Sequence, residues 1–314
     1  MASVDTELCL EPVLQIIQET TDDADELVKK PLRQTLKNSG KLLRPSLLMW
    51  AARCGKAADR ASIVAASAAL ELLHTSTLIH DDIIDDGTVR RGLPCVHSLF
   101  GNSVAVYTGD YIIAKCFKLL HDSGNDALVY DFVMASEKLC KSEIVQYQNR
   151  GREIGRGEYM KIAAGKTGAL FSLALTSGAK LGGLDDSVSK RFGRLGENFG
   201  IAFQIADDCL DFKPDGSVNK DVMGDLRQGL YTMPVILALE KDDGRLRALL
   251  REERTEENLS EVRGAVIALG GIQDAKGMAL SIITDCRREL NKLPVSRENN
   301  YFTRMLNSLE EQEK

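Results

Sequence analysis

The 314-residue chain is poor in the residues that build sheets. Aromatic residues, which favour strands, make up 5% of it, and no stretch alternates apolar and polar residues over the length of a strand. The chain also has only seven prolines, which break helices. Alanine, leucine, glutamate and lysine, which favour helices, are plentiful. Apolar residues recur every three to four positions along most of the chain. We therefore predict an all-α protein without a sheet.

Signals for export, for a membrane and for disulfides are also missing. The seven cysteines are scattered and include no CxxC pair, which excludes a disulfide framework or a zinc site of familiar spacing. No Lys or Arg occurs in the first 28 residues, so we expect neither a secretory signal nor a basic transit peptide. Glu71 and His74 interrupt the apolar run 61–79, which argues against a membrane-spanning helix. We expect a cytoplasmic protein with reduced cysteines.

The balance of charge and the absence of several motifs exclude further classes of function. A formal net charge of −6 argues against non-specific nucleic-acid binding, which requires a basic face. The sequence contains no glycine-rich Walker loop, so the usual machinery of nucleotide-dependent phosphoryl transfer is missing. It also lacks a G-x-S-x-G elbow and a Cys–His signature.

The chain is organised as one long series of helices. No linker divides it, so we predict a single domain over 1–314, beginning with one helix over 10–37. The helix predicted over 60–86 contains "ASIVAASAALELLHTSTLIH", which is apolar or small on nearly every face and should lie at the centre of a bundle. The helix predicted over 187–213 has a similar character near "GIAFQIADD". Both helices end in acidic residues, which suggests one shared cavity.

Those two acidic ends carry the same pattern, DDxxD. The chain holds 25 Asp, and at that frequency the pattern should occur only about 0.16 times. On a helix, residues four apart are neighbours on one face. Two charges about 6 Å apart repel by roughly 3 kcal/mol at an effective dielectric of 20, against about 0.7 kcal/mol in water. The aspartates concerned are Asp81, Asp82, Asp85, Asp207, Asp208 and Asp211.

A divalent cation would relieve that repulsion. Ligands that are all carboxylate oxygens suit Mg²⁺, which usually shares phosphate oxygens with a substrate. The remaining DD pairs, such as Asp22–Asp23 and Asp185–Asp186, lack the third Asp and are expected on the surface. We predict that the six aspartates hold Mg²⁺.

Basic and polar residues near these motifs point to a phosphorylated ligand. Arg and Lys side chains bind phosphate oxygens, whereas the surrounding Ala, Leu, Ile and Phe favour a hydrocarbon. A diphosphate head with an apolar tail satisfies both. Taken singly, each cation could be an ordinary surface charge, and Arg90 and Arg91 could pair with Asp85 and Asp86. The candidates are Lys41, Arg44, His74, Arg90, Arg91, Lys166, Thr167 and Lys220.

Seven segments spread over 38–236 resemble the trans-isoprenyl diphosphate synthase family. They are "GKLLRP", "ELLHTSTLIHDDIIDD", "RRGLPCVH", "TGDYIIA", "GKTG", "FQIADDCLD" and "GDLRQGLYTMP". The resemblance implies the isoprenoid synthase fold, an all-α bundle around a deep central cavity, usually in a homodimer. It also implies a Mg²⁺-dependent, head-to-tail condensation of isopentenyl diphosphate with an allylic prenyl diphosphate.

The same resemblance implies a role for each candidate residue. Both aspartate motifs would hold Mg²⁺ against the allylic diphosphate, which Arg90, Lys166 and Lys220 would also bind. The pocket for isopentenyl diphosphate would consist of Lys41, Arg44, His74 and Arg91. Thr167 and Gln204 would turn oxygens toward the developing carbocation.

Chain length and activity depend on a few further positions. In this family a bulky aromatic at the position of Ser76 or Thr77 blocks the growing tail, so these small residues predict a product longer than twenty carbons. Leu230 stands where the family usually has a second Lys, Met223 where Gly is frequent, and Cys95 where Thr is common.

Two alternatives remain open at this stage. The chain could be a non-catalytic or weakly active partner subunit of a heteromeric synthase, with Leu230 and Met223 as signs of decay. It could also be a class I terpene cyclase, which ionises a diphosphate as well. Such cyclases usually pair DDxxD with an Asn/Asp-Ser/Thr-Glu motif, whereas Asp211 and Asp215 occupy those places here.

Overall fold

The computed structural model describes residues 9–36, 40–56, 59–90, 92–212, 223–294 and 299–313. These residues are almost entirely helical, so the all-α prediction is confirmed. They form two compact units. The first takes its described residues from Met1–Met134, Leu170–Gly193 and Leu293–Glu298, and the second from Ala135–Ala169, Arg194–Lys292 and Asn299–Lys314. That the whole chain is a single domain stays a prediction.

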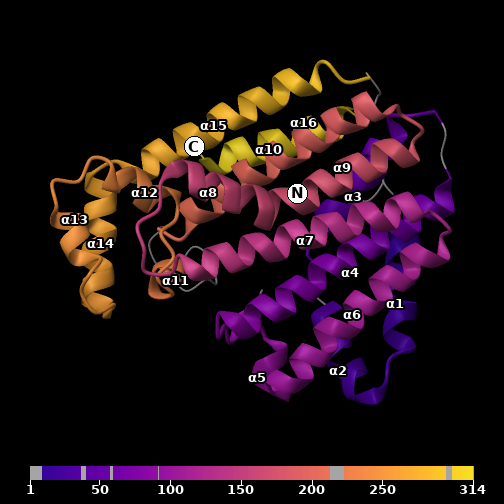
Figure 1. Cartoon of the computed structure of the whole chain (residues 1–314), viewed down its shortest axis with the longest axis horizontal. Coiled ribbons are helices and arrows are strands. Elements are labelled where there is room, and N and C mark those ends of the chain that lie inside the picture. The colour runs from indigo at the N-terminus through magenta and orange to yellow at the C-terminus, as the bar shows by residue number, and fades with distance from the viewer. Residues whose placement is uncertain are drawn as a thin grey trace. The chain divides into compact units, whose positions relative to one another are not determined.

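The first unit is built around a long buried helix. Figure 1 shows α4 beside α6, the element with which it has its most extensive contact. The helices that lie wholly in this unit are α1 (Glu11–Asp22), α2 (Glu26–Leu36), α3 (Leu43–Arg53), α4 (Arg60–Ile84), α5 (Val96–Phe100) and α6 (Asn102–Asp122). Parts of α7 (Asp126–Gln148), α9 (Ala169–Leu181) and α10 (Asp186–Leu210) also belong to it.

Helix α4 is the core helix that the sequence predicts. The side chain of Asp59 caps its first turn by accepting hydrogen bonds from the N–H groups of Ala61 and Ser62. Of the described helices, only α4 is long and apolar enough to span a bilayer by itself, and 83% of its most apolar window is buried. Helices α14 (Glu256–Ala268) and α15 (Gly271–Leu290), bent by 59°, pass the same test only as a pair. The burial of α4 is that of a core helix.

The prediction of one helix over 10–37 is wrong, because the chain breaks after α1. The N–H of Asp23 donates to the carbonyl of Glu19 and ends α1. Two residues on, Asp25 Oδ1 accepts a hydrogen bond from the N–H of Leu27 at 2.9 Å, just as α2 begins. Aspartate side chains that bond nearby backbone N–H groups favour a new helix start over continuation.

The prediction of no sheet is also wrong, although only over four residues. Strands β1 (Val89–Arg90) and β2 (Leu93–Pro94) pair antiparallel, with Val89 opposite Pro94 and Arg90 opposite Leu93. Gly92, in the connection, has φ 77°, a conformation that costs glycine little. Strands of two residues are too short for alternation to reveal them.

Close approach of α3 and α9 fixes another wall of this unit. A Cβ at Gly178 would lie 2.2 Å from the carbonyl oxygen of Leu48, and one at Gly182 would lie 2.3 Å from that of Ala52. The two glycines are four residues apart on α9, so they present one bare strip of backbone to α3. No larger residue fits at either position without moving a helix.

The second unit holds the remaining elements and two apolar clusters. Its elements are α8 (Arg156–Ala163), the π-helical turn η2 (Ala164–Gly168), α11 (Gly224–Arg227), α12 (Met233–Leu239), α13 (Arg245–Leu249), α14 (Glu256–Ala268), α15 (Gly271–Leu290) and α16 (Asn299–Glu313). The clusters pack on opposite sides of α12, since one contains Val235 and Leu239 and the other Met233 and Ile236.

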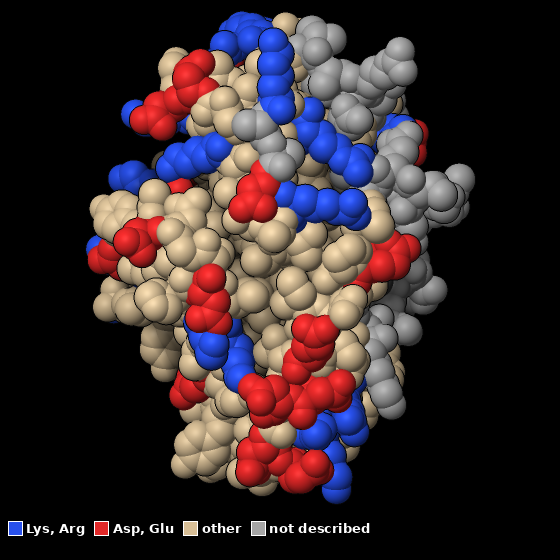
Figure 2. All heavy atoms as spheres, turned by 90° about the vertical axis from the view of Figure 1, so that its right-hand side faces the viewer, with Lys and Arg blue, Asp and Glu red and all other residues tan. Residues whose placement is uncertain are grey.

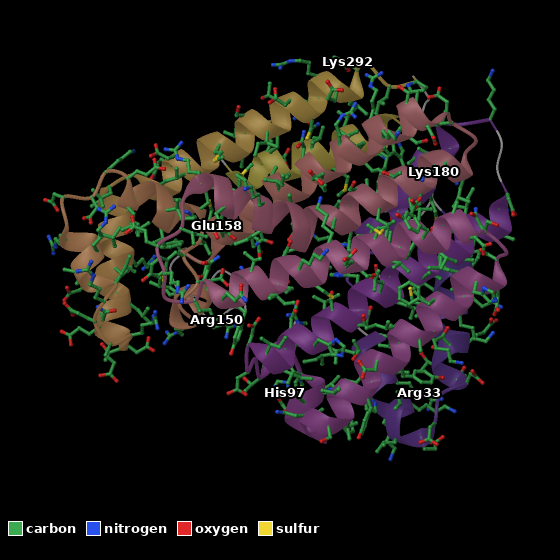
Figure 3. All side chains as sticks on the ribbon, viewed as in Figure 1. Arg33, His97, Arg150, Glu158, Lys180 and Lys292 are labelled. Carbon is green, nitrogen blue, oxygen red and sulfur yellow. The ribbon has the colours of Figure 1, made fainter. Side chains whose placement is uncertain are left out.

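Hydrogen bonds tie the link between α7 and α8 to the stretch before α12. The N–H of Gly151 donates to the carbonyl of Gly229 at 2.8 Å, and Arg150 Nη2 donates to Gln228 Oε1 at 3.3 Å. Figure 3 shows Arg150 on this link and Glu158 in the first turn of α8.

Figure 2 shows one face of the molecule. Among its described residues, basic and acidic side chains both occur beside uncharged ones.

Candidate active site

The first aspartate motif lies at the C-terminal end of α4. Asp85 is the residue after the helix, and its N–H donates to the carbonyl of Asp81 at 2.8 Å. Asp81 and Asp85 are both half-buried, whereas Asp82 is 9% exposed. At about 100° per residue, Asp81 and Asp85 lie on one side of the helix and Asp82 a quarter-turn away. The motif therefore presents two carboxylates together and directs the third elsewhere.

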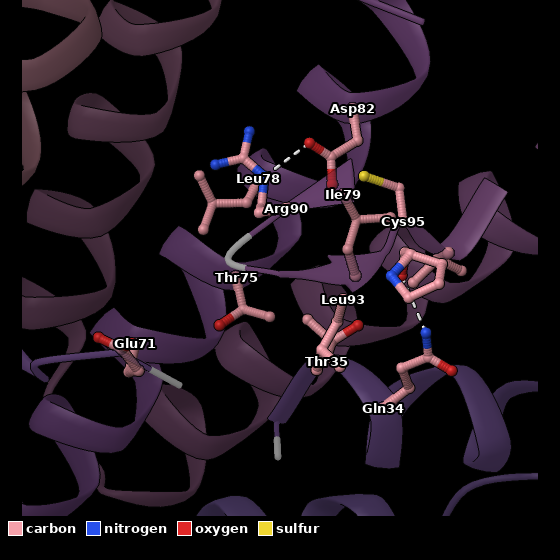
Figure 4. A pocket seen from close by; sticks show the side chains of 12 residues that line it. Gln34, Thr35, Glu71, Thr75, Leu78, Ile79, Asp82, Arg90, Leu93 and Cys95 are labelled. Carbon is pink, nitrogen blue, oxygen red and sulfur yellow. Dashed lines mark hydrogen bonds and ion pairs between the residues drawn. The ribbon is translucent and has the colours of Figure 1, made fainter. Parts of the chain in front are cut away.

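Asp82 is paired within the first unit. Arg90 Nε donates to Asp82 Oδ1 at 2.6 Å, and the thiol of Cys95 hydrogen-bonds to the same carboxylate. Figure 4 shows Arg90 and Cys95 on either side of Asp82. Burial, and then the charge of Asp82, raise the pKa of Cys95 to about 12, so the thiol is a donor. Arg90 thus pairs with an aspartate, but with Asp82, which the alternative stated above did not name.

A small cavity adjoins this pair. It has a volume of about 50 Å³, room for one or two waters. The side chains of α4 that line it recur at helical spacing on the face of Asp82, next to the face of Asp81. Figure 4 shows the cavity, whose polar lining comprises Gln34, Thr35, Glu71, Thr75, Asp82, Arg90 and Cys95.

The two predicted chain-length residues lie on different faces of α4. Thr77 precedes Asp81 by four residues and shares its face, whereas Ser76 lies roughly 140° around the helix. Thr77 is half-buried and donates its hydroxyl to the carbonyl of His74 at 2.8 Å. Ser76 is fully buried and donates to the carbonyl of Leu73 at 2.7 Å. Only Thr77 stands beside the aspartates.

The predicted cations Lys41 and Arg44 lie where α3 begins. Leu42, in the left-handed region with φ 47°, turns the chain into the helix and leaves Lys41 exposed. Arg44 is half-buried, and its guanidinium carbon lies 4.6 Å from the centre of the Phe171 ring on α9. Cation–π contact of this kind holds the planar guanidinium in one orientation. His74 is half-buried on α4, on the face of Asp81.

In the second unit, "GKTG" forms the π-helical turn η2. Single π-helical turns inside α-helices are frequent at functional sites, because they change the direction of the side chains. A Cβ at Gly165 would lie 1.6 Å from Ser142 Oγ on α7, and one at Gly168 would lie 3.1 Å from the carbonyl oxygen of Glu197 on α10. The two glycines let Lys166 and Thr167 pass between α7 and α10.

Lys166 pairs with α7. Its ammonium lies 3.1 Å from Glu143 Oε2 and donates to Gln146 Oε1 at 2.8 Å. Any anion that binds Lys166 therefore competes with Glu143 for the ammonium.

Thr167, Gln204 and Asp208 are brought together as a hydrogen-bonded chain. Thr167 Oγ1 donates to Gln204 Oε1 at 2.5 Å, and Gln204 Nε2 donates to Asp208 Oδ1 at 2.9 Å. Asp208 Oδ2 accepts from the hydroxyl of Tyr159 and from the N–H of Met233. The buried carboxylate thus receives three donors from three elements, α8, α10 and α12.

Burial and a nearby like charge raise the pKa of Asp208. Burial, followed by the nearby charge of Asp225, raises its pKa from 3.8 to about 8, and its three hydrogen bonds oppose the rise. Asp207 and Asp211 are half-buried on either side of it in the sequence. Asp211 Oδ1 also accepts from the N–H of Gly224 at 3.1 Å, which connects the motif to α11.

Met223 shows why glycine suits that position. The residue has φ 63°, in the left-handed region, where a side chain costs roughly 1–2 kcal/mol. Its side chain is 3% exposed and packs with Phe212 and Leu226, which offsets that cost. The apolar cluster thus accommodates Met223 at a position where Gly is frequent.

The donor set fits a hard divalent cation. Half-buried carboxylates at helical spacing, and a carboxyl whose pKa is raised by a neighbouring Asp, are oxygen-only surroundings that Mg²⁺ favours. Within the described ranges, His, Cys, Asp and Glu side chains nowhere form a closed group of three or more suited to a metal. At both motifs the middle aspartate, Asp82 or Asp208, is hydrogen-bonded to other residues.

Two predicted cations, Arg91 and Lys220, lie outside the described residues. The two aspartate motifs lie in different units, so their convergence on one diphosphate stays a prediction.

The structure adds two residues, Tyr159 and Asp225, that the sequence analysis did not identify as part of the site. Asp225 belongs to the segment "GDLRQGLYTMP", so the sequence could have identified it. Tyr159 is a single tyrosine eight residues before Thr167, and nothing in the neighbouring sequence marks it as a site residue.

Comparison with known proteins gives the family. Residues 25–266 match the sequence profile of the family described as polyprenyl synthetase. The nonaprenyl diphosphate synthase of Mycobacterium tuberculosis is 32% identical over 90% of this chain and 86% of its own length. The geranylgeranyl pyrophosphate synthase of Geoglobus acetivorans is 32% identical over 90% and 89%. Heptaprenyl diphosphate synthase component 2 of Geobacillus stearothermophilus is 32% identical over 74% and 73%.

Solved structures agree. Geranylgeranyl pyrophosphate synthase from Lactobacillus brevis superimposes with a TM-score of 0.85 at 31% identity, covering 97% of this chain and 95% of the other. A polyprenyl synthase from Caulobacter crescentus, complexed with calcium and isoprenyl diphosphate, gives 0.81 at 25% identity, covering 97% and 96%. The resemblance drawn from the motifs is confirmed, and this chain belongs to the polyprenyl synthetase family of trans-prenyltransferases, with the isoprenoid synthase fold.

Proposed function

We propose that this chain condenses isopentenyl diphosphate with an allylic prenyl diphosphate, head-to-tail and trans, to give a polyprenyl diphosphate of more than twenty carbons. One observation carries the proposal. Each DDxxD motif ends a central helix, α4 or α10, of a chain that belongs to the family, and each keeps two half-buried carboxylates beside a third that is fixed by partners.

Mg²⁺ is the proposed cofactor, and four of the six aspartates are its proposed ligands. Asp81 and Asp85 share a face of α4, and Asp207 and Asp211 are one helical turn apart. Asp82 and Asp208, also predicted as ligands, support the other four through their fixed positions. The Caulobacter crescentus relative binds calcium with isoprenyl diphosphate, which supports a divalent cation. Bound Mg²⁺ would supply positive charge to the diphosphate oxygens.

The basic residues divide between two diphosphates. Arg90, Lys166 and Lys220 are proposed for the allylic substrate, and Lys41, Arg44, His74 and Arg91 for isopentenyl diphosphate. Arg44 is already oriented by Phe171, so its fork is prepared for a phosphate. To bind the diphosphate, Lys166 must give up its ion pair with Glu143. The loss of that ion pair lowers the affinity of Lys166 for the substrate.

The reaction begins when the carbon–oxygen bond of the allylic diphosphate breaks, and both bonding electrons leave with pyrophosphate. Arg90 and Lys166 stabilise that departing charge. The oxygens of Thr167 and Gln204 face the allylic cation. The double bond of isopentenyl diphosphate attacks it to form the new carbon–carbon bond, and pyrophosphate takes the proton that is lost. Apolar surroundings exclude water, which would trap the cation as an alcohol.

We also propose that the protein works in the cytoplasm as a homodimer. Large apolar side chains are exposed on the first unit, and a second copy of the chain would cover them. They are Leu99, Val106, Tyr107, Tyr130, Val133 and Met134. The alternative of a partner subunit rests on Leu230, which is half-buried between α11 and α12 where a Lys is usual. The likeness to a protein named as component 2 of a heptaprenyl diphosphate synthase keeps that alternative testable.

The test is incubation of the purified chain alone with Mg²⁺, labelled isopentenyl diphosphate and allylic primers of ten, fifteen and twenty carbons. We expect chain-extended diphosphates, identified by chromatography after dephosphorylation. Asp85→Ala should lower the rate at least a hundredfold, while Asp186→Ala, at an exposed acidic pair, should leave it unchanged. A hydrocarbon product would indicate a cyclase instead, and an inactive chain would indicate the partner-subunit alternative.

A further inference from the structure

Tyr159 stands out because a buried hydroxyl meets a buried carboxylate beside the second aspartate motif. The side chain is 6% exposed, and its hydroxyl donates to Asp208 Oδ2 at 2.5 Å. It comes from α8, a helix that supplies none of the predicted site residues. Burial raises the pKa of Tyr159 well above 10, so the phenol keeps its proton.

The hydrogen bonds that meet at Asp208 have a fixed polarity. Tyr159, Gln204 and the N–H of Met233 all donate to the carboxyl group. Because Gln204 turns its Nε2 toward Asp208, its Oε1 must face Thr167, and the single hydroxyl proton of Thr167 is committed to that oxygen. The lone pairs of Thr167 are then left to face in other directions.

The Tyr159 hydroxyl fixes the orientation of the Asp208 carboxyl group on which this polarity depends. It and the N–H of Met233 both bond Oδ2, which leaves Oδ1 to face Gln204 Nε2. Without the hydroxyl, the N–H of Met233 at 3.2 Å is the remaining donor to Oδ2 among these contacts. The carboxyl group could then turn away from Gln204, whose amide would be free to turn over and present an N–H to Thr167.

We propose that Tyr159 is a positioning residue for the transfer step, acting through Asp208 and Gln204 to keep the hydroxyl proton of Thr167 away from the allylic carbon. The inference rests on the proposed function, in which Thr167 faces the developing cation. An oxygen lone pair stabilises positive charge, whereas the positive end of an O–H bond would oppose it. Tyr159 touches no reacting atom itself.

Tyr159→Phe removes only the hydroxyl, and Tyr231→Phe is the matched control. The Tyr231 hydroxyl lies in the same unit and donates to a backbone carbonyl, that of Leu250, at 3.4 Å. We expect Tyr159→Phe to lower kcat about tenfold, with KM for both substrates within about twofold, as for loss of one interaction felt in the transition state. More water-trapped prenyl alcohol should form. Tyr231→Phe should change neither kcat nor product.

A double-mutant cycle with Thr167→Val separates positioning from a structural role. If Tyr159 acts through Thr167, then Tyr159→Phe has no further effect on kcat once the Thr167 hydroxyl is gone. Rates are expressed per folded protein, from the amplitude of thermal unfolding, so that a loss of folded material cannot imitate a loss of turnover. Effects that multiply in the double variant would overturn the inference.

The remaining outcomes are distinct. If the wild-type chain extends a primer but Tyr159→Phe leaves kcat unchanged, or changes KM alone, the inference fails and the proposed function stands. If the wild-type chain forms no chain-extended product under any of the primers, the proposed function fails and the inference fails with it.

Discussion

At the scale of single residues, the two aspartate motifs use their members unequally. The middle aspartate of each is buried and held by partners, Asp82 by Arg90 and Cys95, and Asp208 by Tyr159, Gln204 and Met233. The flanking aspartates stay half-buried. One carboxylate in each motif is therefore fixed by its partners, and the outer pair is the one that we propose binds the cation.

Asp208 should make stability depend on pH in the metal-free protein. Its pKa is about 8 when folded, against 3.8, so the folded state holds the proton more tightly. That contribution is complete below pH 4 and is lost as pH rises toward and through 8, at up to about 1.4 kcal/mol per pH unit. Asp208→Asn cannot titrate. With EDTA present, wild type should lose stability relative to Asp208→Asn between pH 6 and 8, measured by urea unfolding. A constant difference would contradict the assignment.

At the scale of elements, faces of one helix carry separate tasks. On α4 the face of Asp81 also carries His74 and Thr77, the adjacent face of Asp82 lines the small cavity, and Ser76 lies in the core. Helix α9 has its own bare face, at Gly178 and Gly182, against α3. A substitution therefore acts through the face it changes, whatever its distance along the sequence.

Thr77→Phe should shorten the product, because an aromatic ring one turn before Asp81 would stand where the growing tail passes. We expect the longest chain to fall by at least one five-carbon unit, measured by chromatography of dephosphorylated products. Ser76→Phe is the comparison. Ser76 is 0% exposed, so the larger side chain should instead lower stability by about 1–3 kcal/mol. An unchanged product from Thr77→Phe would remove Thr77 from the tail's path.

Gly178→Ala should destabilise the protein by about 1–3 kcal/mol or more, since its Cβ would lie 2.2 Å from the carbonyl oxygen of Leu48. Gly264→Ala is the matched control inside α14, where a Cβ would meet nothing within 4 Å. That variant should gain about 0.5–1 kcal/mol from helix propensity. Urea unfolding measures both, and equal effects would show that the α3–α9 contact is loose.

At the scale of the whole molecule, burial separates the cysteines into three classes. Cys9 and Cys140 are exposed, Cys54 is half-buried, and four others are buried. Burial raises the pKa of Cys116 and of Cys286 to about 12. None of the described cysteines is in a disulfide.

Native alkylation should therefore label two sites. At pH 8, iodoacetamide should modify Cys9 and Cys140 at least ten times faster than Cys95, Cys116, Cys209 or Cys286, because the reagent reaches exposed thiols and not buried ones. Peptide mass spectrometry resolves each site. In urea all seven should react, and early labelling of Cys116 in the native protein would contradict the packing of α6.

The sequence by itself determined the fold class, the positions of most helices, the family and the two DDxxD motifs whose aspartates are proposed for the site. Helical periodicity and the spacing within DDxxD are local properties, and they depend on neighbours a few residues away. For the same reason the predictions from the sequence missed the break after α1, where the side chain of Asp25 bonds the N–H of Leu27, and the short hairpin that carries Arg90.

Only the tertiary structure decided which partner each polar side chain takes. Arg90 pairs with Asp82, Lys166 with Glu143, and Tyr159 with Asp208, and the last two partners are 23 and 49 residues away. Such contacts depend on how helices pack and on the direction in which each helix points its side chains. A motif predicts which residues contact a substrate. The residues that position them are determined by how the helices pack.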